Sequence, residues 1–104
     1  MERVGFTMRL LPGAETEYRR RHAAVWPEML DALRAAGARD YSIFIHGSDL
    51  FAYLVVDDFG AFRSAMAATE VNDRWQAEMA SLIDPLTDPK TGFHRRLEEI
   101  FHLD

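Results

Sequence analysis

The stretch of sequence that decides the fold is Tyr41-Ser-Ile-Phe-Ile-His-Gly-Ser-Asp-Leu-Phe-Ala-Tyr-Leu-Val-Val56. Residues 41–46 and 50–56 are rich in β-branched and aromatic side chains, and the polar residues 47–49 between them are typical of a turn. The stretch therefore predicts two strands joined as a β-hairpin. The second strand is apolar on both faces, with Leu50, Ala52, Leu54 and Val56 on one face and Phe51, Tyr53 and Val55 on the other. Because this pattern is typical of a covered sheet, we expect a layer on each side of it.

The segments before the hairpin predict one strand followed by helical structure. Residues 3–11 alternate between apolar and polar side chains, which is the period of a strand, and the Pro-Gly pair at 12–13 ends it. A helical pattern then runs from Ala14 to Gly37, where the glycine is expected to cap the helix. Pro27 lies inside this pattern, so we expect the helix to kink or restart there.

The segments after the hairpin predict two helices and a last strand. The helices are expected over 58–68, with Asp58 as a candidate N-cap, and over 70–82. Residues 84–89 contain two prolines and predict a loop. Residues 97–103 are expected to form the last strand.

The predicted order of elements is strand, helix, hairpin, helices and strand, in a single domain that spans residues 1–104. This order is typical of an α+β fold of the ferredoxin-like βαββαβ type with a mostly antiparallel sheet. The helices can cover only one face of such a sheet, and no element remains to cover the other. We therefore expect a homodimer that packs sheet against sheet as a dimeric α+β barrel, with a small ligand bound between helices and sheet.

Composition limits the class of protein. The 104 residues are 48% hydrophobic and carry a net charge of −5, which argues against nucleic acid as a partner. The basic run Arg19-Arg-Arg21 is expected to pair with Glu15 and Glu17, which precede arginines by one helical turn. The sequence has no cysteine and no apolar run long enough to span a membrane. Because the strand-like pattern starts almost at Met1, we expect no signal peptide. We therefore expect a cytoplasmic protein.

Candidate catalytic residues lie in Glu17-Tyr-Arg-Arg-Arg-His-Ala-Ala-Val-Trp-Pro-Glu28, where Tyr18, His22 and Trp26 follow one another at steps of four. On a helix this spacing stacks the three side chains on one face. Only His22 has an ordinary pKa that allows it to exchange a proton near neutral pH. The alternatives are that His22 is a structural histidine bonded to a backbone carbonyl and that Trp26 packs in the core.

Other catalytic templates are missing from the sequence. It has no cysteine nucleophile, no glycine-rich phosphate loop and no nicotinamide fingerprint, and its histidines at 22, 46, 94 and 102 lack the spacing of a metal site. The kind of catalysis that remains compatible with these residues is proton transfer without a cofactor. Tyr41 on the second strand and the Trp75-Gln76 pair on the last helix offer aromatic faces and hydrogen-bonding groups to a ring-shaped, hydroxyl-rich ligand. Each of these residues also fits a structural role.

Several stretches of the sequence match one known family. They are Phe6-Thr-Met8, Glu17-Tyr-Arg-Arg-Arg-His22, Trp26-Pro-Glu28, Gly37-Ala-Arg-Asp-Tyr41, Arg74-Trp75 and Leu97-Glu-Glu-Ile-Phe-His-Leu103. On these residues the chain resembles the L-rhamnose mutarotase family nearly from end to end. The resemblance implies a dimeric α+β barrel and an isomerase that interconverts the α and β anomers of L-rhamnopyranose without a metal or a redox cofactor.

The resemblance also implies roles for individual residues. His22 matches the family's proton donor, and the hypothesis is that it protonates the ring oxygen of the sugar. Tyr18, Tyr41 and Trp75 match residues that hold the sugar. Gln76 stands where the family has a second tryptophan, so L-fucose or another 6-deoxyhexose stays open as the substrate. An oxygenase-type barrel and a binding module without chemistry are the remaining alternatives.

Overall fold

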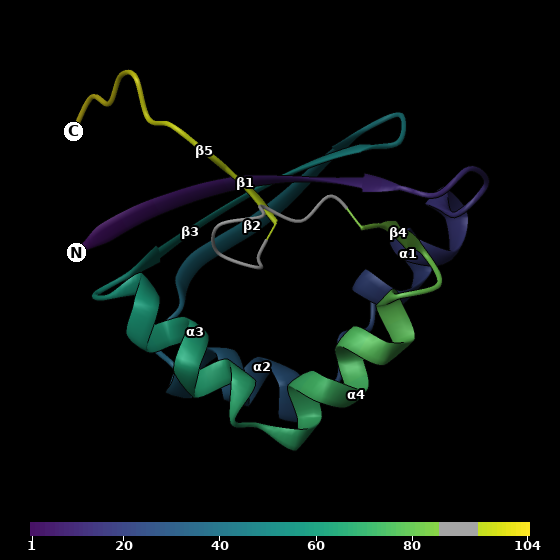
Figure 1. Ribbon diagram of the computed structural model, residues 1–104, viewed down its shortest axis with the longest axis horizontal. Helices are drawn as coiled ribbons and strands as arrows, with labels where there is room; N and C mark the ends of the chain where they lie inside the picture. The colour runs from purple at the N-terminus through teal and green to yellow at the C-terminus, as the bar shows by residue number, and fades with distance from the viewer. Residues whose placement is uncertain (86–93) are drawn as a thin grey trace.

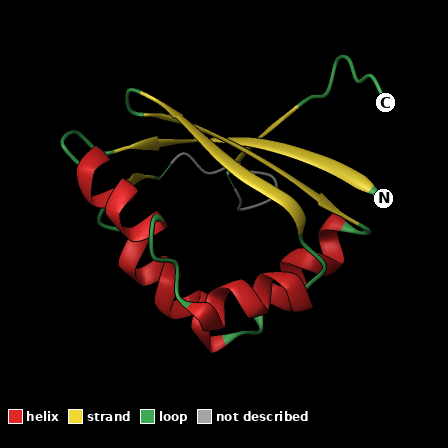
Figure 2. Ribbon diagram, turned by 180° about the vertical axis from the view of Figure 1, so that it is seen from behind, coloured by secondary structure: helices red, strands yellow, loops and turns green. Residues whose placement is uncertain are grey.

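The computed structural model of the protein describes residues 1–85 and 94–104. Its strands are β1 (Glu2–Leu10), β2 (Arg39–His46), β3 (Asp49–Val56), β4 (Ile83–Asp84) and β5 (Arg95–Leu97), and its helices are α1 (Glu15–His22), α2 (Pro27–Ala35), α3 (Phe59–Ala67) and α4 (Glu70–Met79). The strands form one antiparallel sheet in the order β2-β3-β1-β4, with β5 also paired to β1. The helices form a layer on one side of the sheet, and the C-terminal tail lies on the other (Figures 1 and 2). The predicted ferredoxin-like α+β fold is confirmed.

Alternation along β1 and β3 places the core between the sheet and the helices. Leu50 and Leu54 of β3 are 0% and 1% exposed, and Leu54 lies opposite Val4 of β1 in the ladder. The helices add the buried side chains Tyr18, Met29, Phe62, Met66, Val71, Trp75 and Met79. Full burial of each leucine contributes about 1.5–3 kcal/mol to stability, so this shared core fixes the helices against one face of the sheet.

Local signals set the helix ends close to where the sequence predicts them. Gly37 follows α2 with a φ of +100°, a conformation that glycine adopts at little cost, and it ends the helix. Asp58 caps α3 by accepting a hydrogen bond from the Ala61 N–H at 3.0 Å, an interaction that is worth about 1 kcal/mol. Helix α4 ends at Met79 rather than at the predicted Leu82, because Leu82 lies in a turn in which its N–H donates to the Met79 carbonyl.

The long helical pattern is divided at Pro27, as predicted. Helix α1 ends at His22, and Pro27 takes the first position of α2. The expectation that Trp26 continues the face of α1 is wrong, because Trp26 has the extended backbone angles φ −57° and ψ 134°. The proline ring disfavours helical geometry for the residue before it. Trp26 therefore reaches the neighbours of His22 from the linker between α1 and α2.

The strand predicted over 97–103 is also wrong. The ladder with β1 involves Arg95–Leu97, opposite Gly5–Thr7, and residues 98–104 have no regular structure. The tail side chains have β-propensity, but residues 98–104 pair with none of the described strands, and Ile100 is 92% exposed. Strand β4 has no counterpart in the prediction, and residues 86–89 of the predicted 84–89 loop lie outside the described residues.

The face of the sheet opposite the helices, called here the outer face, carries exposed apolar side chains. Phe44 of β2 is 63% exposed and lies opposite Phe51 of β3, which is 43% exposed. Phe101 and Leu103 in the tail are more exposed still. The prediction that the helices cover only one face of the sheet is confirmed for the described residues.

Candidate active site

Two helices and the linker between α1 and α2 bring four aromatic rings together. The His22 ring stacks on Tyr18 of α1 with 4.0 Å between ring centroids, and it meets Trp75 of α4 edge-on at 5.4 Å. Trp26 meets Trp75 edge-on at 5.0 Å. We call these four residues the aromatic cluster. Tyr18 and Trp75 are buried, whereas His22 is only partly buried, so the imidazole can still meet a ligand that arrives from solvent.

A hydrogen bond to the backbone decides which nitrogen of His22 can react. Nδ1 of His22 lies 3.0 Å from the carbonyl oxygen of Tyr18, one helical turn earlier. Because a carbonyl can only accept, Nδ1 carries the proton, and the neutral ring has its lone pair on Nε2. Burial lowers the pKa of His22, and the bond to Tyr18 opposes part of that effect. At neutral pH the imidazole is therefore a base at Nε2. The backbone bond expected of a structural histidine is present, and it leaves Nε2 for chemistry.

Two tyrosine hydroxyls, that of Tyr18 in the cluster and that of Tyr41 beside it, remain protonated. Burial raises the pKa of Tyr18 far above its ordinary value, and the neighbouring Tyr41 raises it further. Burial raises the pKa of Tyr41 to about 12. Because 37% of Tyr41 is exposed, this burial concerns its hydroxyl end rather than the whole side chain. Both phenols are therefore hydrogen-bond donors at neutral pH.

The backbone beside Tyr41 departs from regular strand geometry. The ladder between β2 and β3 is irregular between Arg39 and Ser42, and Asp40 has a φ of +50°. A bulge bends its strand and re-aims the side chains next to it. The sequence signal for this irregularity is weak, since only an aspartate that tolerates the left-handed region marks it.

The structure unites most, but not all, of the predicted site residues. Tyr18, His22 and Trp75 are in ring contact, and Tyr41 is close enough to Tyr18 to affect its pKa. Gln76 is the outlying member. Its side chain is exposed on α4, where the amide Nε2 donates to Asn72 Oδ1 at 3.2 Å.

Charged residues that the sequence reasoning did not assign to the site surround the cluster. Arg21 of α1 donates to Glu17 at 2.8 Å and also to Glu78 of α4. Arg74 of α4 donates to Glu28 of α2 at 3.1 Å, and its guanidinium lies 5.7 Å from the centroid of a Trp26 ring. The spacing of Glu17 and Arg21 predicts their pairing, but the bonds to α4 join residues far apart in the chain, and no local pattern could have revealed them.

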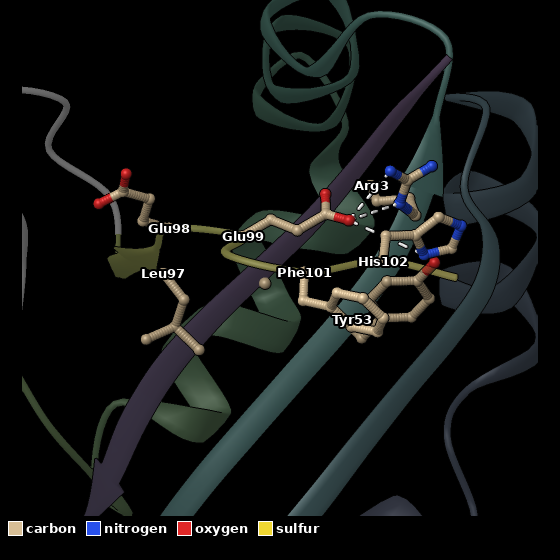
Figure 3. Close-up of a pocket in the computed structure, with 8 residues that line it drawn as sticks. Arg3, Tyr53, Leu97, Glu98, Glu99, Phe101 and His102 are labelled. Atoms are coloured by element: carbon tan, nitrogen blue, oxygen red, sulfur yellow. Dashed lines mark hydrogen bonds and ion pairs between the residues drawn. The ribbon is translucent and has the colours of Figure 1, made fainter. Parts of the chain in front are cut away.

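One cavity adjoins the cluster, and a larger one lies elsewhere. The first has a volume of about 180 Å³ and is lined by Arg20, Arg21, Ala24, Trp26 and Trp75. The second, of about 250 Å³, lies on the outer face between the sheet and the tail, where Arg3 donates to Glu99 at 3.0 Å (Figure 3). Tyr53 and Phe101 line this outer cavity, and none of the predicted site residues does.

Residues 1–85 and 94–104 contain no group of three or more His, Asp or Glu side chains placed to hold a metal ion. Within the same ranges, no helix has both the length and the apolar character needed to cross a membrane.

A family model described as L-rhamnose mutarotase matches residues 3–103. The chain belongs to this family. It is 45% identical to the L-rhamnose mutarotase of Burkholderia orbicola (strain MC0-3) over the full length of both chains. It is 42% identical to that of Listeria monocytogenes serotype 4b (strain F2365) over 99% of each. The crystal structure of an L-rhamnose mutarotase from Formosa agariphila is similar over the whole of both chains, with a TM-score of 0.81 at 31% identity.

Membership of this family confirms two of the expectations from sequence. Mutarotases are isomerases of carbohydrates, so the predicted enzyme class and the resemblance both hold. The similarity in structure extends over the complete chain, including the ferredoxin-like order of strands and helices. Family membership favours a mutarotase over an oxygenase-type barrel or a binding module.

Proposed function

We propose that the protein interconverts the α and β anomers of L-rhamnopyranose and that His22 is its acid–base residue. The observation that carries the proposal is the hydrogen bond from His22 Nδ1 to the Tyr18 carbonyl in a member of this family. It orients the imidazole, which contacts a buried phenol and a buried indole, and it supports Nε2 as the reactive atom.

The proposed reaction moves one proton between two oxygens of the sugar. Nε2 of neutral His22 removes the proton of the anomeric hydroxyl, a C1–O double bond forms, and the bond from C1 to the ring oxygen breaks. The imidazolium then protonates the ring oxygen, which is the step expected from the sequence. Both oxygens were bonded to the same carbon, so one imidazole can serve both. After rotation of the aldehyde, the reverse steps close the ring on its opposite face. Acid–base catalysis of this kind contributes about 10²–10⁴-fold.

The other proposed site residues hold the sugar. The hydroxyls of Tyr18 and Tyr41 donate hydrogen bonds to sugar oxygens, and Trp75 offers an apolar face to its C–H groups. Gln76 lies outside the ring contacts, and its exposed amide, which donates to Asn72, stands where the family has a second indole. This polar group is the observation that supports a second candidate function, a mutarotase for another 6-deoxyhexose such as L-fucose.

Anomer exchange followed by NMR tests the proposal. Saturation of the α-anomer signal transfers to the β-anomer signal at the rate at which the α anomer converts to the β anomer. The protein should accelerate this transfer for L-rhamnose above a blank without protein. L-fucose and L-mannose, run in parallel, identify the preferred sugar. A protein that binds these sugars and accelerates none of them would be a binding module, and the proposed function would be wrong.

We further propose a homodimer in which two outer faces pack together. The exposed, paired Phe44 and Phe51 on the sheet and the exposed Phe101 in the tail support it, since exposed large apolar side chains that gather on one face are typical of protein interfaces. Phe51→Glu should convert the dimer to a monomer in light scattering coupled to size-exclusion chromatography. A wild-type monomer at micromolar concentration would contradict the proposal. The absence of cysteine supports a cytoplasmic location.

A further inference from the structure

The residue before His22 links the helix of the catalytic histidine to another helix. Arg21 Nε donates to Glu17 Oε1 at 2.8 Å within α1, and its Nη1 donates to Glu78 Oε2 of α4. We call these three residues the Arg21 bridge. Arg20 and Arg21 hold the pKa of Glu17 at about 2, so this carboxylate stays charged under all ordinary conditions.

The Arg21 bridge joins the same two helices as the His22–Trp75 ring contact. Arg21 directly precedes His22 on α1, and Glu78 lies about one helical turn after Trp75 on α4. On the other side of Trp75 in sequence, Arg74 binds Glu28 of α2 at 3.1 Å. The indole that meets the imidazole is therefore held between two ion pairs, one to each neighbouring helix.

The exposure of these ion pairs indicates what they do. The side chains of Arg21 and Glu78 are 28% and 46% exposed, and ion pairs at such sites contribute little to stability because water and salt screen them. An arginine that binds two carboxylates at once does restrict how the two helices are oriented to each other, because its donors form a rigid fork. Helix α1 has only eight residues, so a contact next to its last residue controls how His22 is presented.

We propose that Arg21 and Glu78 are positioning residues, which hold the His22 ring against Trp75 so that Nε2 points at the anomeric centre. This inference rests on the proposed function for its consequence in catalysis. The geometric part, the contact between imidazole and indole, can be measured without any sugar.

Tryptophan fluorescence provides that measurement. The chain has two tryptophans, Trp26 and Trp75, so Trp26→Phe leaves Trp75 as the only indole. A protonated imidazole quenches the emission of an indole that it touches, so the emission of Trp75 should fall as the pH is lowered through the pKa of His22. His22→Gln in the same background should abolish this change. In Glu78→Gln most of this pH-dependent fall in emission should disappear, because the His22 ring no longer contacts Trp75.

Kinetics of anomer exchange test the consequence. Glu78→Gln should lower kcat about fivefold, with KM within about twofold of wild type, since misplacement of a catalytic group affects the transition state more than binding. The matched control is Asp49→Asn, which removes one carboxylate from the ion pair between Arg9 of β1 and Asp49 of β3 (3.2 Å). The side chain of Asp49 is 48% exposed, which is similar to the 46% of Glu78. The control should keep the wild-type kcat. Thermal unfolding should shift equally little in both variants.

A double-variant comparison separates the bridge from a general effect of charge. If Glu78 acts through Arg21, Glu78→Gln should have no further effect on kcat once Arg21→Gln is present. Equal effects of Glu78→Gln in both backgrounds would overturn the inference, as would unchanged kcat together with unchanged quenching in Glu78→Gln. A wild-type protein without exchange activity would refute the proposed function, and the quenching of Trp75 would still decide whether the bridge holds the ring.

Discussion

Lowering the pH tests the protonation state that the structure assigns to His22. The bond from Nδ1 to the Tyr18 carbonyl leaves Nε2 as the base, and burial lowers the pKa of His22 below its ordinary value of 6.5. With such a pKa, at least about three-quarters of the imidazole is neutral at pH 7. The kcat/KM for anomer exchange, which reports the pKa of the free enzyme, should therefore be nearly level above neutral pH. Well below the pKa, it should fall about tenfold for each pH unit, in proportion to the neutral fraction.

Exchange NMR on L-rhamnose at anomeric equilibrium measures this profile. The uncatalysed reaction responds to acid and base as well, so the rate with His22→Gln protein in the same buffer serves as the blank. Tyr18 and Tyr41 do not titrate in this range because burial raises the pKa of both phenols. Neither phenol therefore contributes to the acidic limb. If kcat/KM instead rises as the pH falls through 6.5, the imidazolium is the reactive form and the assignment of Nε2 as the base is refuted.

Three further outcomes are expected. His22→Gln should slow anomer exchange about 10²–10⁴-fold in a folded protein. His46→Gln, at an exposed position of β2, should not slow it. Equal rates for the two variants in saturation-transfer NMR would contradict a catalytic role for His22. Tyr18→Phe should raise KM about fivefold, since a hydrogen bond contributes about 1 kcal/mol, and an unchanged KM removes the hydroxyl from sugar binding. The free energy of unfolding should increase with pH from the lowered pKa of His22 up to 6.5, because the unfolded chain takes up the proton first. Urea denaturation at several pH values should show a smaller slope in His22→Gln, with the remainder assigned to His94, whose pKa burial also lowers.

Local patterns in the sequence were sufficient for most of the fold. The signals that act over a few residues are the alternation of residues 3–11, the apolar run 50–56, the turn between the hairpin strands, Gly37 after α2 and Asp58 before α3. Their conformations depend on backbone sterics and near-neighbour hydrogen bonds, which are the same in any fold. The family motif likewise pointed to His22 and Trp75 before any contact was known.

The predictions that failed depended on partners distant in the chain or on a single neighbour that changes the backbone. Residues 98–104 have strand-forming side chains, but a strand needs a second strand to bind, and β1 pairs with Arg95–Leu97 instead. Trp26 follows the helical spacing of His22, but Pro27 forces it into an extended conformation. In both cases the side chains follow the expected pattern, but the backbone conformation depends on another residue or strand.

By itself, the sequence determined the α+β order of elements and the two-faced apolar strand of the hairpin, and it offered one histidine, His22, as the candidate for proton transfer. Only the tertiary structure decided that Nδ1 of this histidine is bonded to a carbonyl, that Trp75 of α4 meets its ring, and that Glu78 binds the adjacent Arg21. The physical reason is the distance along the chain over which each effect acts. Propensity and periodicity act along neighbouring residues, whereas the direction and pKa of a side chain depend on groups that only folding brings within a few ångströms.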